Sequence, residues 1–182
     1  MVVSCITRAA RCRGFRGEAT RGFCASKKLK YYGFHGHLVV SCAGIITACT
    51  VTASNVDERE ASWEVLSDLQ GVVLGDKGYI STWFQQNLQQ ETGLRLWTPS
   101  RKNMEMQTPR RTQGFFLRVR RKIETVIGQL AERFHLERVR ARDLWHLTVR
   151  VGRKLLSHTM AVWLSKQSGL GALEFDKIIN TA

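Results

Sequence analysis

The chain has 182 residues, 43% of them hydrophobic and 24% charged, which is enough for one domain with a real core. Lysine and arginine number 28 against 15 aspartates and glutamates, and the net charge of +13 favours a polyanionic partner. The five cysteines form no CxxC pair, which argues against a zinc or disulfide framework and favours a reduced, cytoplasmic protein.

The charge is unevenly distributed along the chain. Residues 1–34 carry eight basic residues and one acid (+7), residues 35–100 three and seven (−4), and residues 101–154 fifteen and five (+10). Two basic flanks around an acidic middle suit a protein that contacts phosphates on both sides of a metal-binding centre. The alternative is a generic basic binding protein whose acidic middle is a solvated face, and the charge alone does not separate the two.

A pair of β-strands is predicted near the start. Met1 is followed by a short apolar run and then by arginines, without the apolar segment of a signal peptide. The segment HLVVSCAGIITACTVTASN, residues 37–55, is too short an apolar run to cross a bilayer, and Gly44 divides it. Its β-branched residues predict two antiparallel strands, about 37–42 and 45–52, joined by a tight turn, with YYGFHGH leading into the first.

Helices and short strands alternate in the next part of the chain. Apolar residues at helical spacing predict a helix over 56–69 with Asn55 as its cap, and the run GVVLG predicts a buried strand over 71–75. A second helix over 79–93 and a last strand over 94–99 follow. A hairpin followed by strand, helix and strand is typical of an α/β sheet with mixed strand direction.

The remaining part is basic and then helical. Residues 100–113 are polar and basic and contain a proline, which predicts a loop that contacts nucleic acid. Long helices are expected over 114–135 and 140–165. The first of them carries four basic residues within little more than one turn: Arg118, Arg120, Arg121 and Lys122.

The run GVVLGDKGYIS, residues 71–81, ends an apolar strand on a carboxylate, Asp76. One interpretation is a helix N-cap, a role that aspartate commonly takes. The other is that the strand delivers this carboxylate to the open edge of a sheet, where a metal ion binds. Under the second interpretation, Gly75 and Gly78 keep the backbone around the site free of side chains.

A second carboxylate, Glu124, stands in the basic helix. It shares a helix face with Arg120, and Gly128 leaves room beside it. The alternative is a plain i,i+4 ion pair between Arg120 and Glu124 on a solvated face. Together with Asp76, Glu124 supplies two hard oxygen ligands, which Mg²⁺ or Mn²⁺ prefers, and two such ions can support in-line phosphoryl transfer. A site of this kind needs a third carboxylate on a neighbouring strand.

Five segments carry a resemblance to a known family: SKKLKYYGFHGHLVVS, VTASNVDERE, GVVLGDKGYIS, TPSRKNM and RRKIETVIGQLAERFHLERVRARD. They resemble the transposase DDE domain of bacterial insertion sequences, over about residues 4–165. The resemblance implies an RNase H-like α/β fold, with a mixed five-stranded sheet flanked by helices. It also implies DNA transposition, in which the enzyme binds the element ends and cleaves and joins DNA strands by metal-dependent phosphoryl transfer.

The resemblance assigns roles to individual residues. Asp76 matches the family's second catalytic aspartate and Glu124 its catalytic glutamate, both as ligands of Mg²⁺ or Mn²⁺. Arg120 matches an arginine of the signature around that glutamate, although the tyrosine and lysine of the signature are absent from this chain. His35 stands where relatives often carry a lysine.

The resemblance departs most at the start of the chain. Met1–Ser4 occupy the place of the family's first catalytic aspartate, and neither Glu18 nor Asp57 stands where the first strand would put a ligand. The resemblance therefore implies a DDE domain over 1–165 that is incomplete at its N-terminus, with the first strand largely missing, and a C-terminal tail over 166–182. Such a chain is expected to be impaired in catalysis and loosely folded.

The expected partner is DNA, contacted mainly at its phosphates, so that affinity falls steeply with salt. The predicted DNA-binding residues are all basic: Arg11, Arg13, Lys27, Lys28, Arg101, Lys102, Arg110, Arg111, Arg120, Arg121 and Lys122. A second possibility is a non-catalytic DNA-binding fragment that associates with full-length transposase, or with copies of itself, and modulates transposition. The chain has no P-loop and no dinucleotide-binding turn, so no organic cofactor or small-molecule substrate is expected. No apolar run is long enough to cross a bilayer, so no membrane association is expected.

Overall fold

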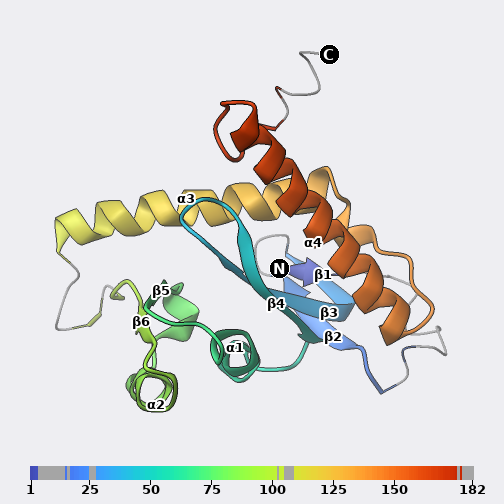
Figure 1. The fold of residues 1–182 in the computed structure, drawn as a ribbon. Helices are drawn as coiled ribbons and strands as arrows, with labels where there is room; N and C mark the ends of the chain where they lie inside the picture. Colours follow the sequence, from blue (N-terminus) through green and yellow to red (C-terminus); the bar gives the residue numbers. More distant parts are fainter. Residues whose placement is uncertain are drawn as a thin grey trace.

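The computed structural model describes residues 1–3, 15, 17–24, 28–101, 103–104, 109–175 and 177. Within these residues the chain forms one four-stranded and one two-stranded sheet with helices packed around them (Figure 1). The elements are, in order, β1 (Val2–Val3), β2 (Thr20–Cys24), β3 (Leu29–Val40), β4 (Ile46–Ala53), α1 (Glu58–Leu66), β5 (Val72–Leu74), the 3₁₀ turn η3 (Lys77–Tyr79), α2 (Thr82–Thr92), β6 (Arg95–Trp97), α3 (Arg110–Glu132), the 3₁₀ turn η4 (Leu136–Arg138) and α4 (Leu144–Gln167).

The long strand β3 organises the larger sheet. It pairs antiparallel with β2 through its first half and with both β1 and β4 through its second half. Phe34 is opposite Val3 on one side and Ala53 on the other. Gly36 permits the close approach of β1, because a Cβ at this position would lie 2.7 Å from Val3 Cγ2.

The predicted hairpin of strands 37–42 and 45–52 is confirmed as β3 and β4. Its turn is closed by a hydrogen bond from the Ser41 N–H to the Ile45 carbonyl, 2.8 Å, and Gly44 adopts a φ of +84°. The first strand starts at Leu29, well before the predicted start, because the glycines of YYGFHG mask its strand character in the sequence. β2, which the sequence did not predict, pairs with this early half.

The expected single mixed sheet is divided in two. β5 and β6 form a separate parallel pair, with Val73 opposite Leu96, and within the described residues β5 has no second neighbouring strand. The strand predicted over 71–75 is present, but it is not buried as predicted, since Val72 is 44% exposed. The strand exists, but it lies at an edge.

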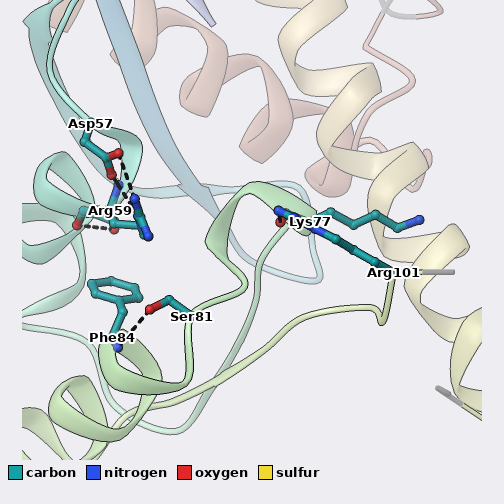
Figure 2. A network of polar contacts seen from close by, with 7 residues as sticks. Asp57, Arg59, Lys77, Ser81, Phe84 and Arg101 are labelled. Atoms are coloured by element: carbon teal, nitrogen blue, oxygen red, sulfur yellow. Dashed lines mark hydrogen bonds and ion pairs between the residues drawn. The ribbon is translucent and has the colours of Figure 1, made fainter. Parts of the chain in front are cut away.

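The helix predicted over 56–69 is confirmed as α1, with a different cap. The Asp57 carboxylate accepts a 2.8 Å hydrogen bond from the Arg59 N–H and also contacts the Arg59 guanidinium (Figure 2). The predicted cap, Asn55, instead contacts the Thr20 hydroxyl, which lies 3.0 Å from the Asn55 N–H. This contact joins the start of β2 to the end of β4.

The later helices also start at different residues from those predicted. The helix expected from residue 79 begins as a 3₁₀ turn, and α2 follows after Ser81, whose hydroxyl accepts the Phe84 N–H (Figure 2). The helix expected from residue 114 begins at Arg110, directly after Pro109, whose fixed φ suits a helix start. No helix in the described part of the chain is long and apolar enough to cross a membrane.

Two clusters of buried apolar side chains hold these elements together. The larger lies between the four-stranded sheet, α3 and α4, and includes Val3, Phe34, Leu130 and Leu147. The smaller joins α1, α2 and the two-stranded sheet around Leu88, which is fully buried. Figure 1 shows the same division, with α3 and α4 crossing near the larger sheet and α1, α2, β5 and β6 grouped beside it.

Cys42 and Cys49 are free thiols. Cys5 and Cys12 lie outside the described residues, and the reduced state of the protein stays a prediction. Phe175, in the predicted tail of residues 166–182, packs edge-on against His158 and Phe134. The boundary of the domain at residue 165 stays a prediction.

Leu130→Ala tests the larger apolar cluster. Leu130 is fully buried on α3, so its truncation should lower the free energy of unfolding by about 2–5 kcal/mol. Leu117→Ala is the matched control on the same helix, because Leu117 is 58% exposed and its truncation should cost less than about 1 kcal/mol. Urea unfolding followed by circular dichroism measures both, and equal costs would contradict the burial of Leu130 in this cluster.

His37 gives the fold a specific dependence on pH. This β3 residue is 8% exposed, and its Nε2 lies 3.1 Å from Thr52 Oγ1. Burial, followed by the positive charges of the Met1 ammonium and His35, lowers the pKa of His37 from 6.5 to about 4. The unfolded chain therefore takes up this proton at a higher pH than the folded chain, and stability is lost as pH falls from about 6.5 to about 4.

Between pH 7 and 4.5 this residue should account for a loss of roughly 2 kcal/mol in the free energy of unfolding. His37→Gln keeps a hydrogen-bonding side chain and removes the titration, so it should lose less stability over the same interval. Urea unfolding at pH 7, 5.5 and 4.5 gives the comparison. Parallel losses in both proteins would assign the pH dependence to other groups.

Candidate active site

Asp76 lies where the chain leaves β5 and enters η3. Its carboxylate accepts a 2.7 Å hydrogen bond from the Lys77 N–H and so caps this 3₁₀ turn. The N-cap interpretation therefore holds for η3, whereas α2 is capped by Ser81. The capping carboxylate is still accessible to solvent, since the Asp76 side chain is 59% exposed.

The turn after Asp76 is packed tightly against the start of α1. A Cβ at Gly78 would lie 2.8 Å from Glu58 Oε2, so only glycine fits without displacing that carboxylate. Burial, followed by the negative charges of Glu58 and Asp76, raises the pKa of Tyr79 to about 12. Glu58 thus lies beside the turn. The sequence analysis did not single out Glu58, because an acid in the first turn of a helix is already explained by its favourable interaction with the helix dipole.

Arg120 joins the two predicted carboxylates. Its Nε donates to Glu124 Oε1 at 2.9 Å, and its Nη1 lies 3.5 Å from Asp76 Oδ1. The hydrogen bond to Glu124, followed by the charge of Asp76, raises the pKa of Arg120. The i,i+4 ion pair expected as the alternative is present, and the same guanidinium also reaches from α3 to the end of β5. Asp76 and Glu124, 48 residues apart, therefore meet at one side chain.

These groups border a cavity of about 660 Å³ between β3, β5, α1 and α3. Glu58, Asp76 and Glu124 contribute its acidic side chains, and Lys77 and Arg120 its basic ones. Most of the remaining lining comes from apolar side chains of the surrounding strands and helices. The cavity therefore combines a charged rim with an apolar interior.

The donor set can be compared with what a divalent cation requires. Asp76 and Glu124 offer carboxylate oxygens on side chains that are more than half exposed. Among the described residues, no three His, Cys, Asp or Glu side chains lie close enough together to hold a metal ion. Two exposed carboxylates still suit Mg²⁺, which keeps several waters and is often bound by one or two carboxylates and substrate phosphates. The Arg120 guanidinium would have to give way, because it takes the place of a cation between them.

Arg101, from the predicted basic loop, contacts the turn that Asp76 caps. Its Nη2 donates a 3.2 Å hydrogen bond to the Lys77 carbonyl, at the turn that Asp76 caps (Figure 2). Arg110 and Arg111 occupy the first turn of α3, not the predicted loop. Ten residues of helix place Arg110 about 15 Å along the axis from Arg120.

The basic cluster of residues 118–122 does not form one patch. Arg120 faces the cavity, and residues two positions away on a helix point about 200° around the axis. Arg118 and Lys122 therefore lie on the opposite side of α3, where the Lys122 ammonium donates to the Cys42 carbonyl. Arg121 is exposed between the two faces. The four basic residues of this turn therefore do not share one face of α3, and their contacts with DNA stay a prediction.

The basic residues near the start of the chain are only partly placed. Arg11, Arg13, Lys27 and Lys102 lie outside the described residues. Lys28 is exposed directly before β3. The extended strand between Lys28 and His37, which lines the cavity, is about 30 Å long. Within the described residues, Lys28 is therefore separate from the Asp76 and Glu124 site.

A comparison with protein families matches residues 1–144 to the family described as the transposase DDE domain. The chain belongs to this family. Comparisons with curated proteins and with solved structures gave no significant match. The family match confirms the resemblance carried by the sequence segments, and transposase DDE domains act in DNA transposition and generally use divalent metals.

Proposed function

We propose that this DDE domain binds DNA across the turn after β5 and the adjoining part of α3, and cleaves and joins strands there by metal-dependent phosphoryl transfer. The observation that supports this proposal is the double ion pair of Arg120. One guanidinium contacts carboxylates from a strand end and from a helix, at the rim of a cavity of about 660 Å³. Two carboxylates held at one point, and open to solvent, are suited to exchanging that guanidinium for a cation.

In this proposal Asp76 and Glu124 hold Mg²⁺ or Mn²⁺, which when bound activates a water or a 3′-hydroxyl and stabilises the leaving oxygen. Arg120 leaves the carboxylates and donates its N–H groups to a phosphate of the DNA, a strong charge-assisted contact. The Lys77 side chain and Arg101 lie at the same turn and position the sugar-phosphate backbone of the DNA strand. The RNase H-like fold implied by the family is part of this proposal.

The second candidate function is a DNA-binding domain that modulates transposition without cutting DNA. It is favoured by the small number of ligands, because the described residues place only two carboxylates at Arg120 and no group of three ligands. We expect any nicking by this chain to be slow for the same reason. The two candidates differ in whether the carboxylates matter to what the chain does to DNA.

Nicking of supercoiled plasmid in the presence of Mn²⁺ tests the catalytic proposal. Asp76→Asn and Glu124→Gln should each reduce the nicking rate by about 10- to 100-fold or more, since even residues that only support a metal ligand cost this much. Glu132→Gln, a change to an exposed carboxylate eight residues further along α3, should leave the rate unchanged.

The same experiment separates the two candidate functions. Nicking that both site variants abolish, with Glu132→Gln active, supports a working site at Asp76 and Glu124. Retained DNA binding without nicking in any of the proteins would favour the modulating function. Nicking that survives in both site variants would refute the proposed roles of these carboxylates.

DNA affinity should depend on salt through the basic residues beside the site. Replacing both Arg101 and Arg121 with alanine should weaken binding and reduce the slope of log K against log salt concentration by about two, one for each phosphate that is no longer neutralised. The control replaces two exposed basic residues of α4, Arg150 and Lys166, and should keep the slope. Fluorescence anisotropy between about 50 and 200 mM salt measures it, and equal slopes in the two double variants would count against the proposed DNA path.

A further inference from the structure

Helix α4 carries an apolar stripe on the side that faces away from the protein. Its inner side is buried through Leu147, Val151 and Val162, and Figure 1 shows α4 as an outer element that crosses α3. On the opposite side of the helix axis, six exposed residues form what we call the outer stripe: Trp145, Val149, Gly152, Leu156, Met160 and Trp163. Leu156, at its centre, is 62% exposed.

The outer stripe is narrow. With about 100° of rotation per residue, its six members fall within roughly 80° of the helix circumference. A helix face that covers a core is usually at least about 100° wide, and a narrower stripe is typical of the seam between two paired helices. The stripe therefore has the width that suits a second helix.

The spacing of the outer stripe reads the same in both directions from Leu156. Stripe residues stand four positions away on each side (Gly152 and Met160) and seven positions away on each side (Val149 and Trp163). A second copy of α4 that runs antiparallel, related by a two-fold axis at Leu156, therefore presents its stripe level with that of the first copy. Two-fold pairing through one self-complementary patch is the commonest form of oligomer.

The sizes of the paired side chains are complementary in this arrangement. Val149 is level with the partner's Trp163, Gly152 with the partner's Met160, and Leu156 with the partner's Leu156. A glycine inside an exposed helix is destabilising relative to alanine, and a Cβ at Gly152 would meet nothing within 4 Å. Packing within the described chain thus gives no reason for a glycine here, whereas a paired helix does, because the gap accommodates a methionine.

The charges of α4 also permit antiparallel pairing. The helix has four basic residues and no acidic one: Arg150, Arg153, Lys154 and Lys166. In the antiparallel pair the two copies of Arg153 are about 9 Å apart along the axis and the two copies of Arg150 about 18 Å apart. Salt screens charges at such separations, since the Debye length is about 8 Å at physiological ionic strength. Arg150 is also nearly level with the partner's Leu164, on which its aliphatic stem can pack.

The area of the outer stripe suits a weak dimer. The stripe runs for about 27 Å along the helix, and its two tryptophans alone expose on the order of 300 Å² per copy. A two-fold pair of stripes would bury roughly 1,000 Å² in total, the lower end of the range for specific interfaces.

We propose that this chain forms a two-fold dimer through antiparallel pairing of the outer stripes, with Leu156 on the axis and a dissociation constant of about 1–100 μM. The partner is a second copy of the same chain. No residue of the Asp76 and Glu124 site is on α4, so this association depends on neither the metal nor the DNA contacts proposed above.

Sedimentation equilibrium of the chain at about 1–200 μM tests this proposal. About 0.5 M salt keeps nucleic acid from bridging the copies, and an apolar seam should persist there. Leu156→Glu places two carboxylates at the axis and should weaken dimerisation about 100-fold or more. Leu117→Glu is the matched control, the same change at a leucine of α3 that is 58% exposed, and it should keep the dimer. A monomer throughout this range, or equal association of the two variants, would overturn the proposal.

Disulfide trapping tests the antiparallel register. Under mild oxidation Leu156→Cys should link to the same residue of the partner, and mass spectrometry of the linked peptide identifies the bond. Gly152→Cys should not link to itself, because the two copies of this residue would be about 12 Å apart along the axis, too far for a disulfide. Links at both positions would indicate a parallel pair, and a link at neither would place the dimer elsewhere. Either result would overturn the proposal.

A lipid surface is the other occupant that the experiment must exclude. An exposed helix face with tryptophans and flanking arginines is also found in helices that lie on anionic membranes. The probe is cosedimentation with phosphatidylglycerol vesicles, with phosphatidylcholine vesicles as the control. A chain that stays monomeric and binds the anionic vesicles, with binding lost in Leu156→Glu and kept in Leu117→Glu, would assign the stripe to lipid and overturn the dimer.

Discussion

Strand β3 is the element on which the rest of the structure depends. It pairs with β1, β2 and β4, so the four-stranded sheet exists only because one twelve-residue strand is long enough for all three. Its side chains enter the larger apolar cluster through Phe34, and Val39 packs against the smaller one. The carboxyl half of the same strand lines the cavity at the site. A change in the register of β3 would therefore alter the core and the site together.

The site residues are positioned by the elements that carry them and not by their ion pairs. Asp76, Arg120 and Glu124 are all more than half exposed, so their ion pairs add little to stability. Their positions come from elsewhere: η3 fixes Asp76 at the end of β5, and the buried part of α3 around Leu130 fixes the helix that carries Arg120 and Glu124. A rigid scaffold that presents loosely held charges suits exchange of Arg120 for another cation. The ion pair thus indicates a position for positive charge without contributing much to the fold.

The sequence predicted the elements whose signals are local. Alternating and helical apolar spacing located the hairpin and the four α-helices, and it located Asp76 at a strand end and Glu124 one turn after Arg120. It missed β2 and the early half of β3, where glycines and arginines carry no strand pattern. The separation of β5 from the larger sheet could not be predicted either, because strand neighbours are decided by long-range pairing. Glu58 and the two faces of the basic helix required the three-dimensional arrangement, and the roles of Asp76 and Glu124 stay predictions.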